Sequence, residues 1–324
     1  MSTTLEQVEK TANLSKNNQM SLMIFQVQYT VDGNEVPYYG MNVFKVREVL
    51  EARAYEISAI PDTNPLIEGM IELRGTYLPV IDLPKWMGFE MSAEEKEKSI
   101  IIVSDFSHNF IGMRVAHIHG VEEKDWSNIH PASNYNVNVN TNQVINHTYL
   151  DNSDTLCFLL DIEKLLIESM PAMAEKIFKS AKEVGSKNIE FSEEIKNKQI
   201  LFAEDSKAIQ KYMGMVFGRL KLDYLSFDNG QLLLDYIAGQ DNLDHVSIIF
   251  TDLEMPVASG HTVIKEVRKD PKAKHLPIVV HTSMTSDNNS REVLNMGADF
   301  FVGKVDTDLI VDTLKMVEEK YGFK

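Results

Sequence analysis

The sequence predicts a chain of two domains, an all-β domain followed by a doubly wound α/β domain. Its 324 residues suffice for two domains of roughly 150 residues each. Strand-like segments with few helices fill the chain up to residue 160, whereas apolar strands alternate with amphipathic helices after Lys198. Alternation of the second kind is typical of a parallel sheet that is covered by helices on both faces.

The N-terminal part shows the pattern of several short strands. Phe25, Val27 and Tyr29 alternate with polar residues, which predicts a half-buried strand, and Asp32-Gly33-Asn34 predicts a turn. Further strands are expected at residues 76–82, 99–104, 110–115 and 155–160. Many short strands with few long helices favour a barrel or a sandwich.

Three polar segments of the N-terminal part are expected to lie outside its core. Residues 1–19 predict a tail or a short helix. Residues 94–98 are too charged to belong to a core, so a loop is expected there. Residues 131–154 are rich in Asn, Ser, Thr and Asp, so an exposed loop or a hairpin is expected there.

A helical and charged linker is predicted between the two domains, at residues 169–197. Apolar residues keep helical spacing from Ile162 to Ala181, with an interruption at Pro171. The residues Gly185-Ser186-Lys187-Asn188 are expected to end the helix, and a charged stretch follows. We therefore expect domains at residues 20–168 and 198–324.

The sequence of the C-terminal domain predicts five units, each of a strand followed by a helix. Strands are expected at residues 200–203, 222–227, 246–250, 277–280 and 300–302. Helices are expected from Ile209 to Leu220, at residues 232–237 and at residues 309–318. Five such units in about 125 residues match the strand order of small flavodoxin-like domains.

Composition excludes several classes of function. The formal net charge of −16 disfavours nonspecific binding to nucleic acid or anionic lipid. No apolar run approaches the ~18 residues that cross a bilayer, so we expect a cytoplasmic protein without membrane insertion. The single cysteine, Cys157, lies in an apolar run and is expected to be a core residue.

Chemically active residues follow the predicted parallel strands at their carboxyl ends, where such sheets carry their sites. They are Glu204, Asp205, Asp252, Thr282 and Lys304. Three converging carboxylates suit Mg²⁺, a lysine and a hydroxyl can hold phosphoryl oxygens, and an aspartate can accept phosphate as an acyl phosphate. The alternative is that Glu204 and Asp205 merely cap the first helix.

With their neighbours, these residues resemble the response-regulator receiver family. The matching segments are Ile200-Leu201-Phe202-Ala203-Glu204-Asp205-Ser206, Ile248-Ile249-Phe250-Thr251-Asp252-Leu253-Glu254-Met255-Pro256, Val279-Val280-His281-Thr282-Ser283 and Gly297-Ala298-Asp299-Phe300-Phe301-Val302-Gly303-Lys304. The resemblance implies that Asp252 accepts phosphate from a histidine kinase. It also implies that Mg²⁺ is held by Glu204, Asp205, Asp252 and the backbone carbonyl of Glu254.

The same resemblance implies that Thr282 and Lys304 contact the phosphoryl group and that Phe301 is the aromatic switch residue. Gly260 matches a turn glycine of the family. Two positions depart from the pattern: Val305 stands where the family usually has proline, and Phe301 stands where tyrosine is frequent and cannot donate a hydrogen bond.

One segment of the N-terminal domain resembles the chemotaxis coupling-protein family. Arg74-Gly75 forms a predicted turn between two apolar strands, and Pro79-Val80-Ile81-Asp82-Leu83 follows. The resemblance implies a pair of SH3-like small barrels that bind both methyl-accepting chemoreceptors and the histidine kinase CheA. The resemblance also implies that Arg74 and Gly75 are interface residues. The alternative is a hairpin with an exposed arginine and no role in binding.

A coupling domain followed by a receiver resembles the CheV family. That resemblance implies an adaptor at chemoreceptor arrays, tuned by phosphorylation or acting as a phosphate sink, and not an enzyme beyond its own phosphorylation and dephosphorylation. The alternative is a response regulator with an unrelated output. Transcription control is disfavoured by the acidic charge and the domain order, and methylesterase activity is disfavoured by the missing nucleophile motif.

Overall fold

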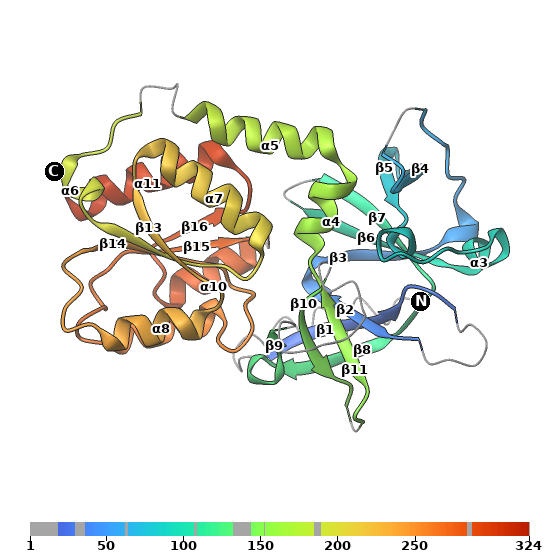
Figure 1. Ribbon diagram of the computed structural model, residues 1–324, viewed down its shortest axis with the longest axis horizontal. Coiled ribbons are helices and arrows are strands. Elements are labelled where there is room, and N and C mark those ends of the chain that lie inside the picture. Colours follow the sequence, from blue (N-terminus) through green and yellow to red (C-terminus); the bar gives the residue numbers. More distant parts are fainter. Residues whose placement is uncertain are drawn as a thin grey trace. The chain divides into compact units, whose positions relative to one another are not determined.

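The computed structural model describes residues 19–29, 36–61, 64–106, 109–131, 144–151, 153–184, 189–283 and 287–323. The chain divides into two compact units, Met1–Ser169 and Met170–Lys324 (Figure 1). The predictions for residues 1–18, for the turn Asp32-Gly33-Asn34, for residues 132–143 and for the helix end at residues 185–188 lie outside the described residues.

The first unit contains a six-stranded sheet in the order β8-β1-β2-β11-β10-β9. Its strands are β1 (Gln19–Gln26), β2 (Tyr38–Asn42), β8 (His117–Asp125), β9 (His130–Pro131), β10 (Val144–Tyr149) and β11 (Leu156–Leu160). The pairs are antiparallel except that β11 runs parallel to β2.

The strand predicted from the alternation at Phe25, Val27 and Tyr29 begins earlier, at Gln19, and ends at Gln26. It lies between β8 and β2 in its sheet and is buried on both faces from Met20 to Phe25, so its main part shows no alternation. Within the segment 131–154, for which an exposed loop or a hairpin was expected, residues 144–149 form β10, which pairs with β11 as a hairpin. This strand is mostly buried, so the expected exposure is wrong for it.

A second sheet of the first unit has five strands in the order β3-β6-β7-β5-β4. They are β3 (Val46–Glu51), β4 (Ile67–Leu73), β5 (Thr76–Ile81), β6 (Ile100–Phe106) and β7 (Asn109–Val115). Each of the two sheets corresponds to one of the two expected small barrels. The strands β4 and β5 form a hairpin whose two turn residues, Arg74 and Gly75, have φ angles of 52° and 81°. Positive φ at both positions matches the twist of a two-residue hairpin and favours glycine at the second.

The helices of the first unit are α2 (Leu83–Trp86), α3 (Ala93–Lys98) and α4 (Ile162–Ser169). The loop predicted at residues 94–98 is wrong, because α3 occupies it. A capping box starts this helix: Glu95 N donates to Ser92 Oγ at 3.3 Å, and Ser92 N donates to Glu95 Oε2 at 2.7 Å. No residue of α3 is buried. The charge of this segment therefore predicted correctly that it lies outside the core, but charge does not prevent a helix.

In the second unit, five parallel strands form a sheet in the order β13-β12-β14-β15-β16. They are β12 (Gln199–Ala203), β13 (Asp223–Phe227), β14 (Val246–Thr251), β15 (Ile278–Thr282) and β16 (Phe300–Gly303). All five expected strands are confirmed within a residue or two at each end, and the order is the flavodoxin-like one. The long apolar runs are explained by burial: every residue of β14 and β15 is buried.

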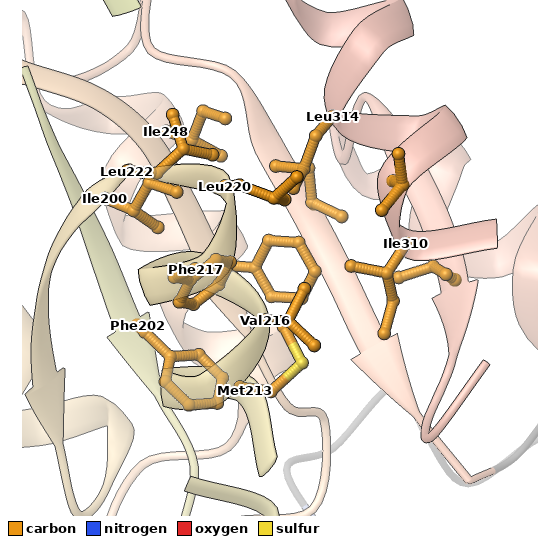
Figure 2. Packing of buried hydrophobic residues seen from close by; sticks show 14 of the residues in the cluster. Ile200, Phe202, Met213, Val216, Phe217, Leu220, Leu222, Ile248, Ile310 and Leu314 are labelled. Carbon is orange, nitrogen blue, oxygen red and sulfur yellow. The ribbon is translucent and has the colours of Figure 1, made fainter. Parts of the chain in front are cut away.

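Helices cover both faces of this sheet (Figure 1). They are α5 (Pro171–Glu183), α6 (Glu193–Lys196), α7 (Lys207–Leu220), α8 (Gly230–Gly239), α9 (Gly260–Lys269), α10 (Asp287–Met296) and α11 (Thr307–Tyr321). One core cluster joins the sheet to α5, α6, α7 and α11, and Figure 2 shows part of it around Phe217. The other joins the opposite face to α8, α9 and α10.

The predicted linker is built into the second unit. Ala181 and Val184 are fully buried against α7 and α11, and Ile195 of α6 belongs to the same core cluster. By contrast, α4 packs within the first unit, where Trp86 Nε1 donates to Glu168 Oε2 at 2.6 Å. The division falls before Pro171, whose ring disfavours helical backbone at the preceding residue.

Cys157 lies in the core of the first unit, as expected, and burial raises the pKa of its thiol to about 12. A thiol so hard to ionise is an inert apolar group. Within the described ranges, no helix is both long enough and apolar enough to cross a bilayer.

Phe217 holds the first core cluster of the second unit together. Its ring centroid lies 5.8 Å from those of Phe202 and Phe250. Figure 2 shows its ring among those of its labelled neighbours. We expect Phe217→Ala to lower the free energy of unfolding of this unit by about 3–5 kcal/mol. Denaturation should be followed by circular dichroism and by tryptophan fluorescence, because both tryptophans, Trp86 and Trp126, belong to the first unit.

The matched control is Leu232→Ala, a change at a side chain that is 47% exposed, for which we expect a loss within about 0.5 kcal/mol. Equal losses for the two variants, or a Phe217→Ala effect confined to the tryptophan signal, would contradict this account of the core.

Candidate functional site

The structure brings the predicted site residues together at the carboxyl edge of the parallel sheet. Carboxylate oxygens of Glu204, Asp205 and Asp252, the acidic cluster, lie within 4.8 Å of one another. Lys304 Nζ reaches into the cluster and lies 2.9 Å from both Glu204 Oε1 and Asp252 Oδ2. Three segments that are distant in sequence therefore meet at one site, because parallel strands place their carboxyl ends along a single edge.

Asp252 is held by the backbone around it. Its N–H donates to Ala203 O at 2.9 Å, and its Oδ1 accepts from Leu253 N at 2.7 Å. The loop after it folds back so closely that a Cβ at Gly260 would clash with the Asp252 carbonyl, which explains a glycine there. The side chain of Asp252 is therefore oriented before any ligand arrives.

Glu204 is fully buried, and its carboxylate lies close to the charged groups of Lys304, Asp252 and Asp205. Its Oε1 accepts from Ser206 N at 3.2 Å and from Lys304 Nζ, while its Oε2 has no hydrogen-bond partner in the described part of the chain. Burial raises the pKa of Glu204 well above its ordinary value; Lys304 opposes this, and the charges of Asp252 and Asp205 add to it. Such a carboxylate is stabilised by a nearby cation.

This donor set fits Mg²⁺. The cluster offers oxygen ligands alone, which that ion prefers, and the unpartnered Glu204 oxygen gives it a place to bind. Asp205 is half-buried, and Glu254 lies half-buried in the loop two residues after Asp252. Capping of α7 does not account for this arrangement, since it leaves the contacts of Lys304 unexplained.

Thr282 ends β15 and Lys304 directly follows the neighbouring strand β16, and both residues are buried. Lys304 N donates to Thr282 O at 3.0 Å, which ties the two strand ends together beside the acidic cluster. Phe301 is half-buried and packs against the core cluster on the α8–α10 face. It therefore borders the site without joining the hydrogen bonds described above.

Two β-branched residues next to the site have left-handed backbone. Val257 has a φ angle of 66° and Val305 one of 58°, a conformation that such residues rarely adopt. No cis peptide bond occurs among the residues that the structure describes, so the bond between Lys304 and Val305 is trans. Strain of this kind costs on the order of 1–3 kcal/mol per residue and is tolerated when surrounding contacts enforce it.

His281 is a site neighbour that received no role from sequence reasoning. Its Nδ1 lies 3.8 Å from Glu204 Oε2, and its ring packs against Phe202 and Phe250. Burial lowers the pKa of this imidazole well below its ordinary value, so the ring is neutral at pH 7. Its position at a strand end was visible in the sequence, but its approach to Glu204 requires the sheet pairing.

In the first unit, Arg74 lies at the exposed tip of the β4–β5 hairpin. Its side chain is 75% exposed and its Nη2 lies 2.8 Å from Glu48 Oε2. Tyr77 on β5 is also exposed, as is Val49 on β3, the strand that carries Glu48. A mixed surface with an arginine and exposed apolar groups is typical of protein interfaces.

Comparison with known proteins assigns each unit to a family. Residues 27–170 match the model of the CheW-like domain, and residues 200–315 match that of the response regulator receiver domain. The protein CheW of Klebsiella aerogenes is 30% identical over 46% of this chain and 85% of its own length.

Relatives with both parts are similar over nearly the whole chain. The chemotaxis protein CheV1 of Helicobacter pylori is 29% identical and covers 94% of this chain and 95% of its own length. CheV2 of the same organism is 29% identical over 95% of this chain and 97% of its own length. With a CheW-like unit followed by a receiver whose acidic cluster is complete, the chain belongs to the CheV-type chemotaxis proteins.

Proposed function

We propose that this chain is a chemotaxis adaptor whose coupling activity is adjusted by phosphorylation of Asp252. The observation that carries the proposal is the pair of contacts from Lys304 to Glu204 and Asp252 in a chain that also contains a CheW-like unit. The CheW-like unit couples chemoreceptors to a kinase, and the receiver makes that coupling respond to phosphate.

Glu204, Asp205, Asp252 and the carbonyl of Glu254 hold Mg²⁺ in this proposal, and the ion supplies positive charge beside the incoming phosphoryl group. Asp252 Oδ2 attacks phosphorus of a phosphohistidine, a P–O bond forms, the P–N bond breaks, and the leaving imidazole takes a proton from solvent. Lys304 shifts from Asp252 to a phosphoryl oxygen, and Thr282 donates its hydroxyl to another. Phe301 follows by repacking at the edge of the core. The chain acts on no other substrate.

The partners in this proposal are the histidine kinase CheA and the cytoplasmic tips of methyl-accepting chemoreceptors, which recruit the chain to receptor arrays. Arg74 and Gly75 form part of the contact surface. The named relatives favour this reading over transcription control or methylesterase activity, because CheV1 and CheV2 are called chemotaxis proteins and match the whole arrangement of the chain.

Phosphorylation at Asp252 is tested by intact mass. Wild-type protein incubated with acetyl phosphate and Mg²⁺ should gain the mass of one phosphoryl group, and Asp252→Asn should gain none. Asp223→Asn, at the opposite end of the sheet, is the matched control and should react like wild type. Equal labelling of Asp252→Asn and wild type would refute the assignment.

Mg²⁺ should stabilise the second unit, by about 2.7 kcal/mol at a concentration 100 times the dissociation constant. Burial raises the pKa of Glu204 well above its ordinary value of 4.5, so the folded metal-free protein loses this proton at a higher pH than the unfolded chain. The resulting contribution to stability is present below pH 4.5 and is lost as the pH rises through the folded pKa. Because Mg²⁺ replaces this proton, its stabilising effect should grow with pH.

The measurement is the thermal midpoint of the second unit with and without MgCl₂ at several pH values. Asp205→Asn should lose most of the increment, whereas Asp223→Asn should keep it. A Mg²⁺ increment that is independent of both pH and Asp205 would argue against this metal site.

Arg74→Ala should weaken capture of CheA or of receptor tails by at least about 1 kcal/mol if Arg74 is an anchoring contact. The matched control is Arg53→Ala, because Arg53 is also exposed and ion-paired, its Nη2 being 2.8 Å from Glu51 Oε2. Binding should be measured by titration with purified partners. Equal, small effects of the two substitutions would remove Arg74 from the interface.

A further inference from the structure

A four-residue segment connects the acidic cluster directly to the helix α5. At its start, Lys304 makes the two ion pairs with Glu204 and Asp252. At its end, Thr307 begins α11 and its Oγ1 lies 2.6 Å from Ser180 Oγ of α5. Only Val305 and Asp306 separate these two buried anchors.

The helix α5 is docked on α7 and α11 by a small mixed contact, here called the α5 docking contact. Ala181 and Val184 supply buried apolar area, and the Phe178 ring meets that of Tyr212 edge to face at 6.4 Å. Tyr212 is fully buried, and its hydroxyl lies 2.7 Å from Thr307 Oγ1. Thr307 is therefore the polar centre of the contact, bonded to α5 on one side and to α7 on the other.

The connecting segment is held under strain from both ends. Val305 has left-handed backbone, which costs a β-branched residue energy. The Asp306 carboxylate fixes the start of α11 by accepting from Leu309 N at 3.0 Å. A displacement of Lys304 cannot be absorbed by a slack loop and is passed to Thr307, three residues away.

We propose that phosphorylation of Asp252 releases the α5 docking contact through the segment from Lys304 to Thr307. The inference rests on the proposed function, since it requires a phosphoryl group at Asp252. The docked arrangement is formed with Lys304 bound to the Asp252 carboxylate. A phosphoryl group there draws Lys304 to its own oxygens, so the strained segment shifts and Thr307 leaves its partners on α5 and α7.

Coupling of this kind acts in both directions. If phosphate at Asp252 disfavours docking of α5, loss of docking favours phosphorylation by the same factor. Ser180 is half-buried at the edge of the contact, so Ser180→Ala removes one hydrogen bond without leaving a large cavity. This variant should accumulate more phosphorylated protein than wild type at a limiting concentration of acetyl phosphate.

The test is amide hydrogen exchange of the full chain, read in peptides that cover residues 171–184, with intact mass recorded on the same samples. With acetyl phosphate and Mg²⁺, exchange in this helix should accelerate about fivefold or more. Ser180→Ala and Thr307→Val should exchange faster without phosphodonor and respond less to it. Thr313→Val, a change at another buried threonine of α11, is the matched control and should behave like wild type.

The outcomes separate the two levels of inference. No mass gain at Asp252 would overturn the proposed function and this inference with it. Full phosphorylation with unchanged exchange in α5 would overturn this inference alone. If Thr307→Val fails to fold, the test of the coupling rests on Ser180→Ala. Exchange in α5 and phosphorylation that both equal those of wild type in this variant would reject the coupling.

Discussion

The second unit depends on one buried cation. Glu204 and Asp252 are almost completely withdrawn from water, and Lys304 is the group that balances them, through two contacts of 2.9 Å. Buried carboxylates without a partner cost several kcal/mol each, so removing the lysine would leave a repulsive site at the edge of the sheet. The same lysine directly follows β16, and its N–H donates to Thr282 O, so it both balances the charge of the site and fixes the end of β16 beside β15.

That constraint explains why the neighbouring backbone tolerates unfavourable geometry. Val257 and Val305 keep left-handed conformations on the two loops that flank the site. Each loop is fixed at its base: Gly260 N donates to Leu253 O in one, and Lys304 is bound to the carboxylates in the other. The site is thus pre-arranged with some strain stored in it, which is the physical state of an element that can change between two arrangements.

The sequence predicted the receiver well because its strands are buried on both faces and appear as continuous apolar runs. Glu204, Asp252 and Lys304 were found because each of them directly follows such a run. In the first unit, the buried strand β1 shows no alternation of apolar and polar residues. The helix α3 is specified by the capping box at Ser92 and Glu95, but the high charge of this segment led to the prediction of a loop. The contacts of Thr307 with Ser180 and of His281 with Glu204 join residues that are 127 and 77 positions apart. Because these residues are so distant in sequence, no local sequence pattern predicts the contacts.

The boundary at Met170–Pro171 has a consequence for the kinetics of signalling. Because α4 belongs to the CheW-like unit and the receiver follows without a long spacer, a kinase bound by the first unit, as proposed above, would meet the receiver as a tethered reactant. Short tethers give effective concentrations on the order of millimolar. Phosphotransfer within one assembly is then insensitive to how much of this chain the cell contains, whereas a freely diffusing receiver would compete for the same kinase by mass action.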